Sequence, residues 1–162
     1  MAVLALDLGW EFGWCLWRRG DRITSGVVNL RRDAHTDGLR LLAKRQWLTA
    51  TLGQLEGAGE KLTDVVYEQI TFVGKNGVET LHAHGKQLGA VESWCALKKV
   101  AEPRGIAWDV IKKHVTGQRS AARELVLKTI QQRFPDVQNH NQASAVAVML
   151  TAQFKFPAKA AG

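Results

Sequence analysis

The sequence is poor in cysteine and in long apolar runs, and it contains no internal repeat. Two cysteines among 162 residues, Cys15 and Cys95, are too few for a disulfide scaffold or a four-cysteine zinc site. We therefore expect both to be reduced core thiols in a cytoplasmic protein. No apolar run approaches the ~18 residues of a membrane span. The start, MAVLALDLGW, lacks a basic segment and contains Asp7, so we expect neither a signal peptide nor membrane insertion.

The composition favours one folded, basic domain. Hydrophobic residues make up 46% of the chain and charged residues 23%, which excludes disorder of the whole chain. The length suits a single domain, which we place at residues 1–156, with a frayed tail at 157–162. Lysine and arginine outnumber the acids 22 to 15, giving a formal charge of +7. This excess favours a polyanionic partner, with nucleic acid first.

The order of apolar patterns along the chain predicts an α/β fold. Strands are expected at residues 2–6, 12–17, 23–30, 62–68 and 106–110, with a hairpin turn at 18–21. Helices are expected at residues 37–56, 78–100, 120–134 and 139–154. Three strands in an antiparallel meander, followed by strands reached through helices, imply a mixed five-stranded sheet with helices on both faces.

Two of these helices carry further local signals. Asn139 and Gln142 have the spacing of a capping box, which places the start of the last helix at or beside Asn139. In the first helix, we expect the apolar residues near helical spacing to face the core, namely Leu39, Leu42, Trp47, Leu48 and Leu52.

Two carboxylates carry the strongest chemical signal. Asp7 follows the first apolar strand and Glu68 ends the fourth. A buried, unpaired carboxylate costs several kcal/mol or takes up a proton, and two of them on neighbouring strand ends repel each other. A divalent cation would relieve that repulsion, and hard oxygen ligands favour Mg²⁺ or Mn²⁺. The alternative is that each carboxylate caps a loop or pairs with a surface lysine.

Four motifs occur in order along the chain: LALDLGWEFGW before a hairpin, VVYEQITFVGKNG, IKKHVTGQRSAARE and NHNQASAVAVML. Together they resemble the RuvC-type Holliday junction resolvases of the RNase H-like superfamily, especially the shorter bacteriophage forms. The resemblance covers residues 3–150. It implies an RNase H-like fold and a structure-selective endonuclease that resolves four-way DNA junctions by paired phosphodiester hydrolysis as a homodimer. Two Mg²⁺ or Mn²⁺ ions per site would activate a water and stabilise the leaving oxygen.

The sequence departs from this family at the start of the last helix. Asn139, Asn141 and Ser144 stand where the family commonly has acids. We hypothesise that Asn139 is an introduced replacement of an aspartate that silences the enzyme. The alternative is a natural variant that uses His140 as ligand or base, and Asn139 also suits a helix N-cap. The predicted catalytic residues are Asp7, Glu68, Asn139 and His140, and the predicted metal ligands are Asp7, Glu68, Asn139 and Asn141.

These neutral residues leave a second functional interpretation open. A site with two charged ligands would bind metal weakly until a DNA phosphate joined it. A catalytically silent protein of the same fold that binds branched DNA is therefore the alternative function. Replication forks or other branched DNA are further possible substrates for either version.

The resemblance also places DNA contacts and a dimer interface. An aromatic side chain at the position of Phe72 stacks at the crossover in similar resolvases, although Phe72 could instead fold back onto the sheet. For the apolar face of the helix at residues 78–100, which the resemblance assigns to a dimer interface, the alternative is ordinary core packing. The remaining predicted DNA contacts are Lys75, Asn76, Lys86, Lys112, Lys113, Arg119 and Arg123. The predicted interface lies on the helix at residues 78–100 and comprises Leu81, Leu88, Val91 and Cys95.

Overall fold

A computed structural model describes residues 1–18, 20, 22–32, 34–70 and 77–156. Its centre is a five-stranded sheet in the order β3-β2-β1-β4-β5. The first three strands form an antiparallel meander, and β4 and β5 join it in parallel. The mixed sheet predicted from the sequence is therefore confirmed. The strands are β1 Ala2–Asp7, β2 Glu11–Arg18, β3 Arg22–Asn29, β4 Leu62–Gln69 and β5 Arg104–Ala107.

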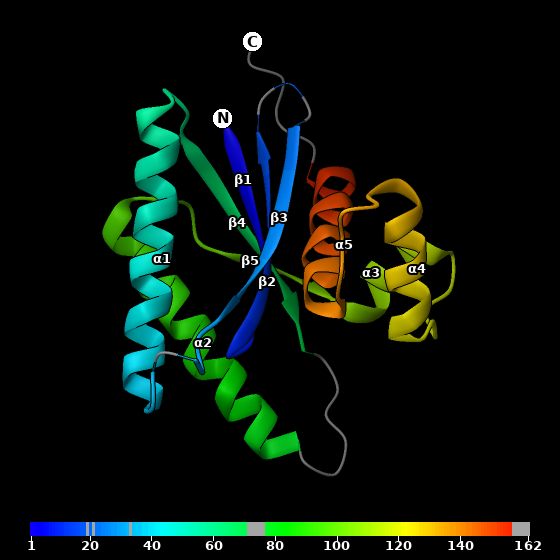
Figure 1. Ribbon diagram of the computed structural model, residues 1–162, viewed down its shortest axis with the longest axis horizontal. Helices are drawn as coiled ribbons and strands as arrows, with labels where there is room; N and C mark the ends of the chain where they lie inside the picture. The colour runs from blue at the N-terminus through cyan, green and yellow to red at the C-terminus, as the bar shows by residue number, and fades with distance from the viewer. Residues whose placement is uncertain (19, 21, 33, 71–76, 157–162) are drawn as a thin grey trace.

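Five helices among the described residues cover the two faces of the sheet. They are α1 Asp37–Gly57, α2 Gly77–Lys98, α3 Trp108–Thr116, α4 Arg123–Arg133 and α5 His140–Lys155. Figure 1 shows α1 and α2 on one side of the sheet and α3, α4 and α5 on the other. None of these described helices is long and apolar enough to cross a membrane.

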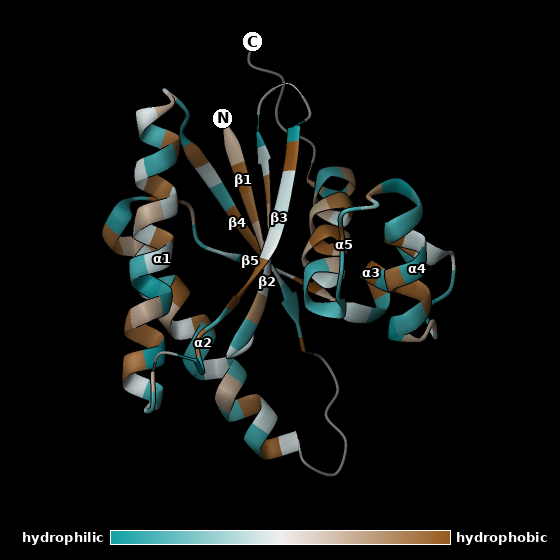
Figure 2. Ribbon diagram, viewed as in Figure 1, coloured by the Kyte–Doolittle hydropathy of each residue, from teal (hydrophilic) through white to brown (hydrophobic). Residues whose placement is uncertain are grey.

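Each face of the sheet has its own apolar core, because side chains alternate along the strands. In β1, Leu4 and Leu6 pack with residues of α1 and α2, whereas Ala5 packs with residues of α5. Figure 2 shows brown, apolar residues along the strands and on the helices at both faces of the sheet. Cys15 and Cys95 are free and buried, one in each core, as predicted.

The predicted strand at residues 106–110 is wrong at both ends. The strand occupies Arg104–Ala107, and helix α3 begins at Trp108 and ends before Gly117, which has a φ of +79°. A short apolar run does not distinguish a strand from a buried helix by periodicity alone. Helix α3 was therefore not predicted from the sequence. Ile111 is its buried residue.

The inward face of α1 also differs from the prediction. Leu39 and Leu42 are each 51% exposed, while Leu48 and Leu52 are buried as expected. The buried stripe of this helix begins instead at Lys44, a lysine that is only 1% exposed. A charged side chain therefore occupies a core position at the end of the sheet where β1 leads into β2.

Candidate functional site

The two predicted acids lie side by side on one face of the sheet. Strands β1 and β4 are parallel neighbours with Leu6 opposite Tyr67, so Asp7 and Glu68 follow at the next position of each strand. Neighbouring strands are ~4.8 Å apart. Alternation places Asp7 on the same face as Ala5, the face that α5 covers. The same argument, from the neighbouring Val66, places Glu68 there.

Burial makes both carboxylates unusually weak acids. Desolvation raises the pKa of Asp7 to about 6, although the positive charges of Arg123 and Lys44 oppose the shift. Desolvation likewise raises the pKa of Glu68 to about 7, and the negative charge of Asp7 adds to that rise. Arg123 and Lys112 act in the opposite direction on Glu68. The acid pair is thus costly to ionise unless a cation approaches it.

One cation reaches Asp7 from the opposite face of the sheet. The Lys44 Nζ donates a hydrogen bond to the Gly9 carbonyl at 3.2 Å and lies 4.2 Å from the centre of the Phe12 ring. Burial lowers the pKa of Lys44 to about 7, and the negative charge of Asp7 opposes that shift. Lys44 therefore ties α1 to the β1–β2 turn and places a positive charge near Asp7.

Lys44 was not predicted as a site residue, although the sequence carries a signal for it. Lys44, Leu48, Leu52 and Leu55 follow one another at intervals of four, four and three residues, so they share one helix face. Extending the spacing of Leu48 and Leu52 by one turn toward the start of the helix places Lys44 on the core-facing side. Lysine is almost never fully buried without a partner.

A second cation approaches Glu68 from the other side. An Arg123 Nη2 lies 3.9 Å from Glu68 Oε1, with the arginine side chain 51% exposed and the glutamate side chain 9% exposed. The Arg123 guanidinium also lies 5.7 Å from the centre of the Trp108 ring. Glu68 Oε2 is buried and has no hydrogen-bond partner among the described residues.

Glycine 13 allows the start of α5 to approach this site. Gly13 pairs with Asp7 across the β1–β2 ladder. A Cβ atom at Gly13 would overlap the Asn141 carbonyl oxygen. The Asn141 Nδ2 donates to the Glu11 carbonyl at 3.2 Å, which holds the helix against β2. The first turn of α5 therefore lies beside the strand pair that carries Asp7.

Neutral groups with local structural roles occupy the start of α5. Asn139 is the N-cap, and its Oδ1 accepts a hydrogen bond from the Gln142 backbone N–H at 2.9 Å, so the predicted helix start is confirmed. Ser144 is buried. The Nδ1 of His140 is buried without a hydrogen-bond partner in the described part of the chain. These residues add no negative charge to the acid pair.

The predicted DNA contacts lie in different parts of the structure. Arg123 and Lys112 lie close enough to Glu68 to influence its pKa, and Lys113 is exposed on α3. Both lysines lie within α3, a helix that was not predicted from the sequence. Arg119 forms an ion pair with Asp109 at 2.9 Å. Phe72, Lys75 and Asn76 lie outside the described residues.

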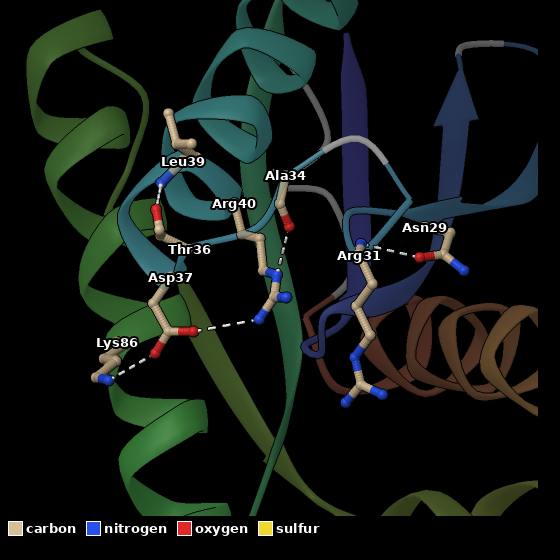
Figure 3. A network of polar contacts seen from close by, with 8 residues as sticks. All are labelled: Asn29, Arg31, Ala34, Thr36, Asp37, Leu39, Arg40 and Lys86. Carbon is tan, nitrogen blue, oxygen red and sulfur yellow. Dashed lines mark hydrogen bonds and ion pairs between the residues drawn. The ribbon is translucent and has the colours of Figure 1, made fainter.

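Lys86 belongs to a separate polar network at the start of α1 (Figure 3). Its Nζ lies 2.8 Å from Asp37 Oδ2, and Asp37 Oδ1 accepts a hydrogen bond from Arg40 at 3.4 Å. The Arg40 Nε donates to the Ala34 carbonyl at 3.0 Å, and its guanidinium lies 5.5 Å from the Trp10 ring centre. This network joins α1, α2 and the β1–β2 turn, so Lys86 already has an acidic partner.

The predicted interface residues are only partly available to a partner. Val91 and Cys95 are buried in the core between α2 and the sheet, so their inclusion in the interface is wrong. A side chain without exposed surface has nothing to present to a second molecule. Leu81 is 44% exposed, and Leu88 is partly buried against the same core.

The acid pair has the chemistry to hold a divalent ion. The two carboxylates, with the Oε2 of Glu68 unpartnered, are hard oxygen donors suited to Mg²⁺, which is commonly held by one or two carboxylates together with substrate phosphates. No group of three or more His, Cys, Asp or Glu side chains that could hold a metal occurs in the described part of the chain. The Asn139 Oδ1 is already the N-cap acceptor. Asp7 and Glu68 are therefore the residues that would hold an ion.

Comparisons with solved structures identify the fold. The chain is similar to Thermus thermophilus RuvC in complex with a Holliday junction substrate, with a TM-score of 0.76 and 21% identity over 96% of this chain and 94% of that one. A second T. thermophilus RuvC structure gives a TM-score of 0.73 and 19% identity over 95% and 94% of the two chains. No protein-family model and no curated protein matches the chain. The chain therefore has the RuvC-like, RNase H-like fold, as predicted, and its phage-like character stays a prediction.

Proposed function

We propose that this chain is a metal-dependent, structure-selective DNA endonuclease that acts on branched DNA, with four-way junctions as its preferred substrate. The observation that carries the proposal is the acid pair of half-buried Asp7 and buried Glu68 at adjacent strand ends of a RuvC-like fold. Paired carboxylates at such a position suit the hydrolysis of a phosphodiester. The net charge of +7 suits a nucleic-acid partner.

Four residues of the candidate site have specific roles in this proposal. Asp7 and Glu68 hold a divalent ion, Mg²⁺ or Mn²⁺. Such an ion, when bound, supplies Lewis-acid activation of the scissile phosphate. Lys44 holds the β1–β2 turn through the Gly9 carbonyl and thereby positions Asp7. Arg123, at the start of α4, binds a phosphate oxygen of the substrate.

The DNA path extends from the acid pair over α3 and α4. Lys112 and Lys113 on α3 contact phosphates, and Phe72, Lys75 and Asn76 between β4 and α2 supply the predicted stacking and phosphate contacts. These contacts grip the backbone rather than read base sequence, which suits recognition by DNA shape. Cleaving two opposing strands of a junction requires two sites, and a symmetric dimer through α2 supplies them.

A silent DNA-binding protein is the second candidate. The observation that favours it is the neutral start of α5, where the Asn139 Oδ1 caps the helix. A site with two acids and three nearby cations, Lys44, Lys112 and Arg123, attracts a metal ion weakly. The same fold and basic surface would then hold branched DNA without cutting it.

A cleavage assay on a synthetic four-way junction separates the two functions. We expect the junction to be nicked in Mg²⁺ or Mn²⁺ by the chain itself or, where Asn139 silences it, by Asn139→Asp. Adding Asp7→Asn to the active version should leave junction binding without cutting, because it removes an acid. Asn139→Asp should increase the rate, because it adds a negative charge near the pair while keeping a good N-cap. If both the original chain and Asn139→Asp bind the junction and neither cuts it, the protein is a silent DNA-binding protein. Equal cleavage of linear duplex would refute structure selectivity.

A further inference from the structure

Three cations act on the acid pair: Lys44 on Asp7, Lys112 on Glu68, and Arg123 on both. Lys44 comes from α1 behind the sheet, and Arg123 comes from α4 on the face of the acids. The positive charges of Lys44 and Arg123 both oppose the rise in the pKa of Asp7, and Arg123 also opposes the rise in the pKa of Glu68. Positive charge therefore opposes both acids in the DNA-free site, from Lys44 and Arg123 and, at Glu68, also from Lys112.

Lys44 and Arg123 differ in how firmly they are held. Lys44 is 1% exposed and is fixed by the Gly9 carbonyl and the Phe12 ring. The Arg123 side chain is 51% exposed and lies 3.9 Å from Glu68 Oε1, which is longer than a hydrogen bond. Arg123 can therefore leave Glu68 by rotating into solvent, whereas Lys44 has no such route.

Glu68 itself is incompletely satisfied in this arrangement. Arg123 approaches Oε1 only, and Oε2 is buried without a hydrogen-bond partner among the described atoms. A buried carboxylate oxygen without a partner is costly, so its position indicates a ligand that binds there. A cation that displaces Arg123 would satisfy both oxygens.

We propose that Arg123 is an exchangeable counter-ion of Glu68, which a DNA phosphate draws away so that the carboxylate becomes free to bind a divalent ion. This inference rests on the proposed function, because it takes DNA as the competitor. Arginine pairs with phosphate through two parallel hydrogen bonds, a geometry that it lacks with Glu68. Metal binding then follows DNA binding, and by linkage each ligand strengthens the other. The free protein is thereby kept from holding a metal ion at a nuclease site that contains no substrate.

The test is the binding of Mn²⁺ to DNA-free protein, measured by titration calorimetry and by the electron paramagnetic resonance of free Mn²⁺. At pH 8.5, above the raised pKa of Glu68, we expect Arg123→Gln to bind Mn²⁺ about tenfold more tightly than the original chain, because a competing charge is removed. Arg123→Lys keeps the charge and should bind close to the original affinity. Arg133→Gln is the matched control, since it removes the same charge from the other end of α4 and should change nothing.

An unchanged or weaker Mn²⁺ affinity in Arg123→Gln would overturn the exchange, as would an equal gain in Arg133→Gln. Thermal unfolding of each variant shows that the comparison is made on folded protein. A merely structural role for Arg123 would lower the affinity, which is opposite to the expected change. Junction binding is measured separately on the original chain. Tighter Mn²⁺ binding by Arg123→Gln without junction binding by the original chain would keep Glu68 as a metal ligand under Arg123 control but refute DNA as the competitor and the function.

Discussion

Ionising Glu68 costs folding free energy, because its carboxylate is buried beside another acid. Its pKa is raised to about 7, by desolvation first and by Asp7 second. The unfolded chain releases this proton near the ordinary value of 4.5, so between pH 4.5 and 7 the folded state holds more protons than the unfolded state. Stability therefore falls as the pH rises through this window. At neutral pH the ionised Glu68 lowers the free energy of unfolding, but the proposed metal ligand requires the ionised carboxylate.

Glu68→Gln should remove much of that loss. We expect the metal-free variant to lose less unfolding free energy between pH 4.5 and 8 than the original chain, by on the order of 2 kcal/mol, since one pKa unit corresponds to about 1.4 kcal/mol. Urea unfolding at a series of pH values measures the difference. Glu124→Gln, an exposed acid on α4, is the control and should leave the pH profile unchanged. Parallel pH profiles for Glu68→Gln and the original chain would contradict the buried, uncompensated carboxylate.

At the scale of elements, the contact between β2 and α5 decides where the helix begins relative to the acid pair. Gly13 is the point of closest approach, since any side chain there meets the backbone of Asn141. The cap at Asn139 and the bond from Asn141 to the Glu11 carbonyl then fix the first turn. The sheet and the helix thus form one rigid support for the site.

Gly13→Ala should destabilise the protein and displace the start of α5. Overpacking of a close contact costs ~1–3 kcal/mol, and backbone atoms cannot yield as a flexible side chain can. Urea unfolding measures the loss, and a shifted pH dependence of any cleavage would report the displaced helix. Gly53→Ala is the matched control, because Gly53 lies within α1 with nothing near its added Cβ and should stabilise by ~1 kcal/mol. Equal stability of Gly13→Ala and the original chain would contradict this role for Gly13.

For the whole molecule, the proposed dimer depends on the apolar surface that α2 leaves uncovered. Leu81 is 44% exposed on the first half of that helix, whereas Val91 and Cys95 in the second half are in the core. An exposed apolar patch on a helix suits a second copy that presents the same face, as two-fold symmetry requires.

Leu81→Asp should convert the dimer to a monomer without unfolding it, because a buried charge at the interface is costly while the exposed site tolerates it. Size-exclusion chromatography with light scattering measures the mass, and thermal unfolding checks the fold. Leu97→Asp is the control, since Leu97 is 66% exposed near the other end of the same helix and should leave the mass unchanged. A monomeric original chain at all concentrations, or a dimeric Leu81→Asp, would refute an interface at Leu81.

Much of the fold was predictable from local pattern. Strand periodicity, the positions of Asp7 and Glu68 at strand ends and the cap at Asn139 each depend on a few neighbouring residues, so the sequence carries them directly. The mixed five-stranded sheet with its antiparallel meander followed from connection rules for short loops and crossover helices. Helix α3 was missed because a short apolar run after β5 fits either type of element.

What the sequence by itself determined is the identity and order of the chemical groups: two strand-end acids, neutral residues where a third acid is expected, and a basic surface. Only the tertiary structure decided which cations face those acids. Lys44 and Arg123 are 37 and 116 residues away from Asp7 along the chain, and only the packing of α1 and α4 against the sheet brings them to it. Charge interactions act through space, so the electrostatic balance of the site depends on packing that no local pattern records.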